Sequence, residues 1–164
     1  LRRLSDTLKT NPNELEDRFA QMFEEYRGNR KLLEKLQAQQ LKGEAGRVLF
    51  GAKTVKGIKI VTAVFRDLSA DELMQMGDMV RAKEQSIVAV FASVNGEKIS
   101  LLAVCGDEAV KAGVRAGDLI KHVTAITGGS GGGKPQRAMG GAKDEMKLDN
   151  AFATIDEFVS DKVK

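Results

Sequence analysis

The sequence predicts a mixed α/β (α+β) fold, with a long N-terminal coiled-coil-like helix followed by a small mixed β-sheet domain with packed helices. The first forty residues carry apolar side chains at heptad spacing, whereas short β-branched runs and turn signals begin after Gly46. The 164 residues are 42% hydrophobic and 30% charged, which is typical of a globular chain with one core. We therefore predict a helical subdomain at 1–44 and a globular domain at 45–164.

The N-terminal helix is predicted to begin where Asn11 caps it, Pro12 takes its first position and Glu14 its third, and to run to Gly43. Apolar residues follow steps of three and four along it, with Asn29 and Gln40 as polar interruptions. The seam consists of Leu15, Phe19, Met22, Tyr26, Asn29, Leu33, Leu36 and Gln40. It can face a second copy, giving a homodimer through residues 15–40, or upstream helices, or its own globular domain.

Two strands are predicted next, at 48–53 and 58–65, separated by a turn at Lys56-Gly57. The second is apolar on both faces, as a central strand is. Ser69 and Glu72 form a capping box, which predicts a helix through Val80.

A second pair of strands, 87–91 and 99–104, is predicted to join near Asn95-Gly96, a strong hairpin signal. Short helices at 107–112 and 118–126, a glycine loop and a short strand near 136–139 come after them. A closing helix is predicted from the stripe of Leu148, Phe152, Ile155 and Val159.

The glycine loop, from Gly128 to Gly141, carries Lys134 and Arg137, with Lys143 just beyond it, and no acidic residue lies between them. Glycines permit positive φ and leave backbone N–H groups uncovered, and cations beside such donors suit phosphate oxygens. The loop is therefore interpreted as an anion site, for which nucleic-acid backbone is the expected ligand. A flexible Gly/Ser linker is the alternative, but the amphipathic helix that follows favours an enclosed site.

Two catalytic motifs match part of the loop's residue pattern, but each lacks a feature that the motif requires. Pro135 replaces the hydroxyl residue that a P-loop requires, and no predicted strand leads into Ser130 to make a nucleophile elbow. The single histidine, His122, lies in an apolar helical segment, where a surface or core-edge position is expected. Cys105 lies in an apolar run and is expected to be buried. We predict no catalytic residue and no metal site.

Composition restricts which classes of protein this chain can belong to. The net charge of +3 is modest, and the absence of Trp argues against rows of aromatic side chains that stack on bases. No stretch is apolar and long enough to cross a membrane, and no secretory pattern opens the chain, so a cytoplasmic protein without membrane contact is expected. Because the chain begins at Leu1 without an initiator Met, we expect a piece of something longer.

The block from Gly128 to Asp144, followed by Lys-Leu-Asp-Asn-Ala at 147–151, resembles the C-terminal domain of bacterial alanine-tRNA ligase (alanyl-tRNA synthetase), a member of the DHH-associated domain family. This block is specific, whereas the region before Val48 matches only in its helical character. The resemblance implies a non-catalytic module that binds the outer corner of alanine tRNA, links the aminoacylation and editing domains upstream in the same chain, and can dimerise through its helix.

The backbone donors and cations of the glycine loop set the expected site. Nucleic-acid contacts are expected at Gly131, Gly132, Gly133, Lys134, Arg137 and Lys143. The resemblance implies no cofactor for this fragment, since ATP, magnesium and zinc belong to other parts of such a ligase.

Two other functions stay open. The chain can be the substrate-binding domain of a DHH-type phosphoesterase, although those relatives usually have a histidine after the glycines, where this chain has Lys134 and then Pro135. It can also be a pure dimerisation module in which the seam is the function.

Overall fold

The computed structural model describes residues 14–164, which divide into two compact units after Gln40. One long helix, α2 (Leu15–Phe50), accounts for the described part of the first unit and contributes its last turns to the second. The predicted helix start at Asn11 and Pro12 lies outside the described residues.

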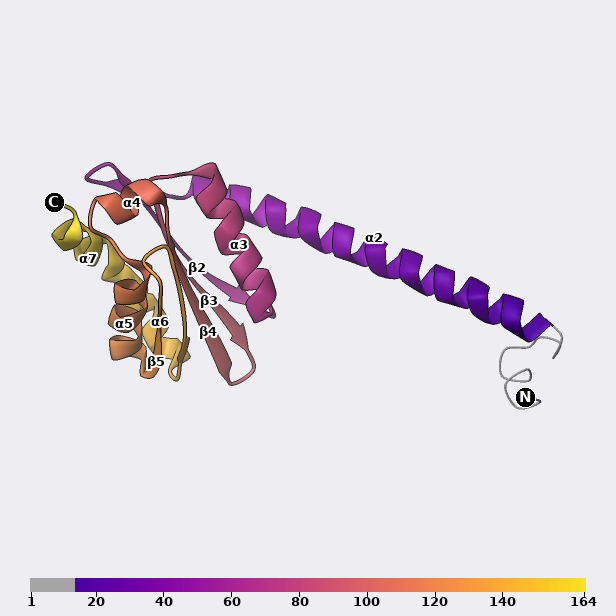
Figure 1. The fold of residues 1–164 in the computed structure, drawn as a ribbon. Coiled ribbons are helices and arrows are strands. Elements are labelled where there is room, and N and C mark those ends of the chain that lie inside the picture. Colours follow the sequence, from indigo (N-terminus) through magenta and orange to yellow (C-terminus); the bar gives the residue numbers. More distant parts are fainter. Residues whose placement is uncertain (1–13) are drawn as a thin grey trace. The chain divides into compact units, whose positions relative to one another are not determined.

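Residues 41–164 form a six-stranded mixed sheet with helices on both faces (Figure 1). The strands lie in the order β1-β2-β3-β4-β6-β5, and only β2 and β3 run parallel to each other. The elements, in chain order, are β1 (Lys53–Val55), β2 (Ile58–Arg66), α3 (Ala70–Lys83), β3 (Ile87–Asn95), β4 (Lys98–Cys105), α4 (Asp107–Lys111), α5 (Ala116–Thr127), β5 (Gly129–Gly133), β6 (Arg137–Ala142), the 3-10 helix η2 (Glu145–Lys147), α6 (Leu148–Ala153) and α7 (Ile155–Lys162).

The sheet separates two hydrophobic layers, because successive side chains of a strand point to opposite faces. In β3, Val88 and Val90 pack in the layer under α5, α6 and α7, whereas Ala89 and Phe91 pack in the layer under α3. Burial of both faces explains why β3 and β4 are almost continuously apolar, as central strands are.

Local signals in the sequence are confirmed where they are strongest. The Ser69 side chain accepts a hydrogen bond from the Glu72 N–H, and the Glu72 carboxylate accepts one from the Ser69 N–H, which completes the capping box of α3. The Asn95-Gly96 signal also marks a real hairpin between β3 and β4, in which Gly96 adopts a φ of +59°.

The strand predicted at 48–53 and the helix end predicted at Gly43 are wrong. The chain stays helical to Phe50, and the first strand begins only at Lys53. Val48 and Leu49 pack beside buried Leu41 and Ala45 in the layer that contains α3. A helix that buries one face on a sheet therefore accounts for the apolar residues that suggested a strand.

The described part of the first unit is exposed except at Leu15, which is partly buried. Every side chain from Glu16 to Gln40 is exposed, including predicted seam residues such as Phe19 (64%), Tyr26 (62%) and Leu33 (58%). Ion pairs along the helix join Arg27 to Glu24 and Arg30 to Glu34.

Within residues 14–164, no helix has the length and apolar character needed to cross a bilayer.

Candidate nucleic-acid interface

The glycine segment is a β-hairpin rather than a loop. Gly129–Gly133 form β5, the edge strand of the sheet, and pair antiparallel with β6, which is longer than the strand predicted at 136–139. The Lys134 N–H donates to the Arg137 carbonyl at 2.9 Å and closes the turn between them. Glycine disfavours strands intrinsically, so this hairpin is stabilised by its tertiary contacts.

Close packing against α5 explains several of the glycines. A Cβ at Gly131 would lie 2.6 Å from Cγ2 of Ile120 on α5, and one at Gly140 would lie 2.9 Å from the same atom. Gly132 differs, because a Cβ there would meet no atom within 4 Å. Positive φ, which glycine permits, occurs within the segment only at Gly128 (+67°) and Gly129 (+136°).

The outer edge of β5 leaves backbone donors uncovered. In an antiparallel pair the hydrogen-bonded residues alternate. Since Lys134 bonds with Arg137, Gly132 bonds with Met139, whereas the N–H groups of Gly131 and Gly133 point away from β6. Both of these glycines are exposed. The exposed donors expected at this segment are therefore present at Gly131 and Gly133, while the Gly132 N–H is used within the hairpin.

The three predicted cations are distributed over both ends of the hairpin. Lys134 and Arg137 flank the turn, and Lys143 follows β6 at the opposite end, about 20 Å along the strand at ~3.3 Å per residue. All three residues are exposed. Arg137 also lies 3.4 Å from a carboxylate oxygen of Asp78 on α3, so an acidic group from a distant element reaches this segment.

One further cation lies at the turn and was missed in the sequence. The Ala116 N–H donates to the Pro135 carbonyl at 2.8 Å, which joins the start of α5 to the hairpin turn. The exposed N-cap residue of α5, Arg115, therefore lies beside the turn that carries Lys134. No local pattern marks Arg115, because the two segments meet only through the fold.

His122 and Cys105, the two other side chains considered in the sequence analysis, have structural rather than catalytic environments. His122 is hydrogen-bonded to the Thr154 hydroxyl at 2.8 Å and stacks near the Phe158 ring, as expected for a core-edge histidine. Cys105 is buried as predicted, and burial raises the pKa of its thiol to about 12. Among residues 14–164, no three His, Cys, Asp or Glu side chains are grouped so that they could hold a metal ion.

Comparison with known proteins identifies a family and a set of relatives. The DHHA1 domain model matches residues 57–161. An alanine--tRNA ligase of Alkaliphilus oremlandii is 33% identical over 159 residues, which are 97% of this chain and 18% of that protein. The alanine--tRNA ligase of a Parafrankia species is 37% identical over 160 residues, with the same shares covered. The chain thus spans about a fifth of the length of these curated relatives.

Solved structures show the same fold. The C-Ala domain from Aquifex aeolicus alanyl-tRNA synthetase matches with a TM-score of 0.62 and 28% identity, over 66% of this chain and 97% of that domain. RecJ from Thermus thermophilus, solved in complex with Mg²⁺, matches with a TM-score of 0.54 and 12% identity, over 82% of this chain and 20% of RecJ. The similarity to RecJ is one of fold alone.

Proposed function

This chain belongs to the DHHA1 domain family, and from that membership we propose that it is a non-catalytic tRNA-binding module of an alanine-tRNA ligase. It binds the outer corner of alanine tRNA and links aminoacylation and editing in domains upstream in the same chain. Supporting this, relatives named alanine--tRNA ligase match 97% of the chain, and a solved C-Ala domain has the same fold. Protein synthesis in the cytoplasm is the expected setting.

The observation that carries the proposal is the outer edge of β5. Gly131 and Gly133 direct unpaired N–H groups outward, and Lys134 follows immediately in the chain. A phosphate can approach such an edge closely, because glycine has no side chain of its own beside the N–H group. Lys134, Arg137 and Lys143, together with Arg115, supply the positive charge that attracts the backbone.

Recognition of this kind depends on shape and phosphates and does not depend on base sequence. The corner of a folded tRNA offers helical backbone and 2′-hydroxyls, which proteins contact without reading bases. We therefore expect this module to bind different tRNA species with similar affinity, and selection of alanine tRNA to take place in other domains.

Binding of the 164-residue chain to fluorescently labelled tRNA, measured over a range of salt concentrations, tests the proposal. Lys134→Ala should weaken binding similarly for alanine tRNA and for an unrelated tRNA. Loss of one phosphate contact should also reduce the slope of log K against log salt by roughly 0.7–0.9. Lys53→Ala, on β1 at the opposite end of the strand order from β5, is the matched control and should leave the slope unchanged.

Gly132→Val adds bulk without altering charge, and its Cβ meets open space. The variant should fold and should hinder close approach of the tRNA backbone. If Lys134→Ala, Arg137→Ala and Gly132→Val all fold, as judged by circular dichroism, and all keep wild-type affinity and salt slope, the β5 edge is not the contact.

A second candidate function, self-association through α2, is favoured by the exposed seam. Apolar side chains that repeat at heptad spacing and stay in water are suited to packing against a second helix. Phe19, Tyr26 and Leu33 are each more than half exposed, and Asn29 would fix the register of a dimer at some cost in stability. Leu33→Asp should then convert a dimer to a monomer in sedimentation equilibrium. A wild-type chain that sediments as a monomer at high concentration, or a dimer unaffected by Leu33→Asp, would exclude this function.

A further inference from the structure

The edge of the sheet opposite β5 is formed by β1 and β2, and β1 covers only half of β2. β1 is three residues long and pairs with Ile58, Lys59 and Ile60 of β2, so the second half of β2 has a sheet neighbour only on the β3 side. An uncovered strand edge presents a row of backbone groups that another strand can pair with.

The direction of these groups follows from the hydrogen bonds to β3. The N–H groups of Lys59 and Asp67 donate to carbonyls of Ser86 and Val94 on the β3 side. Because alternate residues of a strand direct their N–H and C=O groups to opposite sides, the intervening residues Thr62, Val64 and Arg66 direct theirs outward. Within residues 14–164, the backbone groups of Thr62 and Val64 have no partner at this edge.

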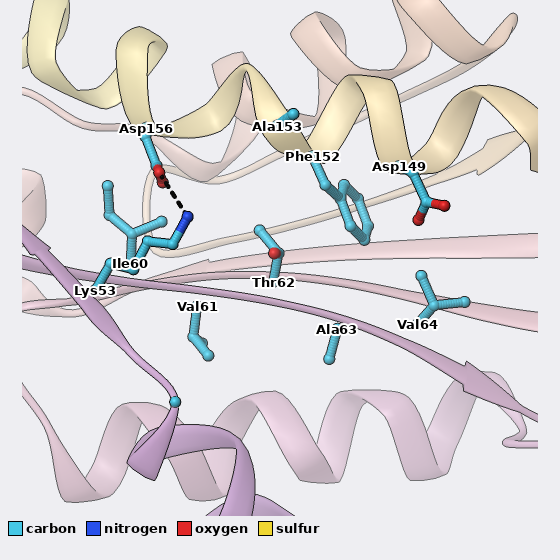
Figure 2. A pocket seen from close by; sticks show the side chains of 11 residues that line it. Lys53, Ile60, Val61, Thr62, Ala63, Val64, Asp149, Phe152, Ala153 and Asp156 are labelled. Carbon is cyan, nitrogen blue, oxygen red and sulfur yellow. Dashed lines mark hydrogen bonds and ion pairs between the residues drawn. The ribbon is translucent and has the colours of Figure 1, made fainter.

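A cleft of about 460 Å³ lies beside this edge. In Figure 2, Thr62 and Val64 point from β2 toward α6, and Phe152 and Asp149 extend from α6 toward them. An ion pair between Lys53 and Asp156, with 3.2 Å between nitrogen and oxygen, closes one end. The cleft therefore has an apolar floor next to unpaired backbone groups.

The distribution of exposed apolar side chains points to the same place. Among residues 41–164, the large hydrophobic side chains that are exposed are Phe50 (95%), Val64 (40%) and Met146 (91%). Val64 lines the cleft, and Phe50 directly precedes Gly51, which also lines it. Met146 is next in the chain to Glu145, whose carboxylate accepts a hydrogen bond from Arg66 of β2 at 2.7 Å. An exposed apolar side chain in a cleft, such as Val64, is typical of an interaction surface.

The charges around the cleft favour an occupant with a positively charged side chain. Asp156 is neutralised by Lys53, and Glu145 by Arg66. Asp149 is exposed and forms no ion pair with another of the described residues. A Lys or Arg on an added strand, in register with Val64, could pack its aliphatic stem on Val64 and Phe152 and place its charge at Asp149.

We propose that the free edge of β2 and this cleft bind an extended peptide segment of a partner protein by strand addition, with a basic residue opposite Val64. The backbone of Thr62 and Val64 provides the main-chain hydrogen bonds, and the cleft provides side-chain selectivity, as in other complexes formed by strand addition. This surface is separate from the β5 edge, since β1 and β5 lie at opposite ends of the strand order.

Selection from a phage-displayed library of random nine-residue peptides on the 164-residue chain tests the inference. Enriched peptides should carry Lys or Arg among β-branched or aromatic residues. Hydrogen exchange with one such synthetic peptide should protect the amides of Thr62, Val64 and Arg66. The intervening amides, at Ala63 and Phe65, should already be protected in the free chain, because they bond to β3.

Three substitutions test the outward backbone N–H of Val64 separately from the charge of Asp149. Val64→Pro removes an outward N–H without breaking a bond to β3 and should weaken peptide binding at least tenfold. Val64→Ala keeps that N–H and should cost only a few-fold. Asp149→Lys, which leaves the strand untouched, should change the selected basic residue to an acidic one. Failure to enrich any peptide would overturn the inference, as would selection unaffected by Asp149→Lys, unchanged binding to a folded Val64→Pro, or protection confined to the β5 edge.

Discussion

Gly131→Ala is expected to destabilise the globular unit strongly, because a Cβ at this position has no space. It would lie 2.5 Å from the Gly140 Cα, 2.6 Å from the Met139 carbonyl oxygen and 2.6 Å from Cγ2 of Ile120. Two of these atoms belong to the backbone, so relief requires β5 to move away from β6 and α5. Overpacking of this kind costs about 1–3 kcal/mol, and the backbone contacts favour the upper half of that range.

This loss in the free energy of unfolding can be measured as a decrease in melting temperature. Unfolding entropy is about 2.1 cal/mol/K per residue, so residues 41–164 give roughly 0.26 kcal/mol/K. A loss of about 2–3 kcal/mol should lower Tm by roughly 8–12 °C. The matched control, Gly132→Ala, meets no atom within 4 Å and should change stability by no more than about 1 kcal/mol, or ~4 °C.

Thermal unfolding followed by circular dichroism and calorimetry on both variants distinguishes a packed hairpin from a flexible segment. Because only Gly131 lacks space for a Cβ, equal Tm values for Gly131→Ala and Gly132→Ala would refute the steric conflict. Such a result would mean that β5 does not pack on α5 and that the glycine segment serves as a linker.

Three further outcomes are expected. With its thiol pKa raised to about 12, Cys105 should resist iodoacetamide at pH 8 in the native chain and react after unfolding in guanidinium, as mass spectrometry can show. Hydrogen bonds from Lys59 and Ser86 lower the pKa of Glu84 from 4.5 to about 2, so its contribution to stability should be present above pH 4.5 and be lost as pH falls toward 2. Tm of Glu84→Gln should accordingly depend less on pH over that interval than wild-type Tm, and parallel profiles would contradict the assignment. Ser69→Ala removes the N-cap of α3 and should cost about 1 kcal/mol in urea unfolding, unlike Ser160→Ala, which leaves that cap intact.

The sequence predicted those elements whose signals are local. The capping box at Ser69 and the turn at Asn95-Gly96 each consist of a few adjacent residues, and both form as predicted. The apolar residues near Val48 were ambiguous, because such a run fits a strand or one face of a helix. The surface that buries them comes from α3 and the sheet, which that run alone does not specify.

The geometry of the candidate site could not be predicted from the sequence for a similar reason, because it depends on contacts between distant segments. Glycines and cations in sequence indicated an anion site, yet the strand they form depends on pairing with β6 and on contact with Ile120. Arg115 and Asp78 reach the same hairpin from α5 and α3, and both are distant in sequence. Which of the glycine N–H groups are free is a question of strand register, and register follows from tertiary pairing.

The two ends of the sheet present similar backbone groups in opposite chemical surroundings. At β5, outward N–H groups belong to glycines and adjoin Lys134, so the exposed surface is polar, positive and without side-chain bulk. At β2, outward groups belong to Thr62 and Val64 and adjoin an apolar cleft under Asp149. A phosphate backbone has no apolar side chain to place in such a cleft, and a peptide strand gains no side-chain contact from a glycine edge. The side chains next to each open edge differ in this way, which is why we propose nucleic acid as the partner of β5 and a peptide as the partner of β2.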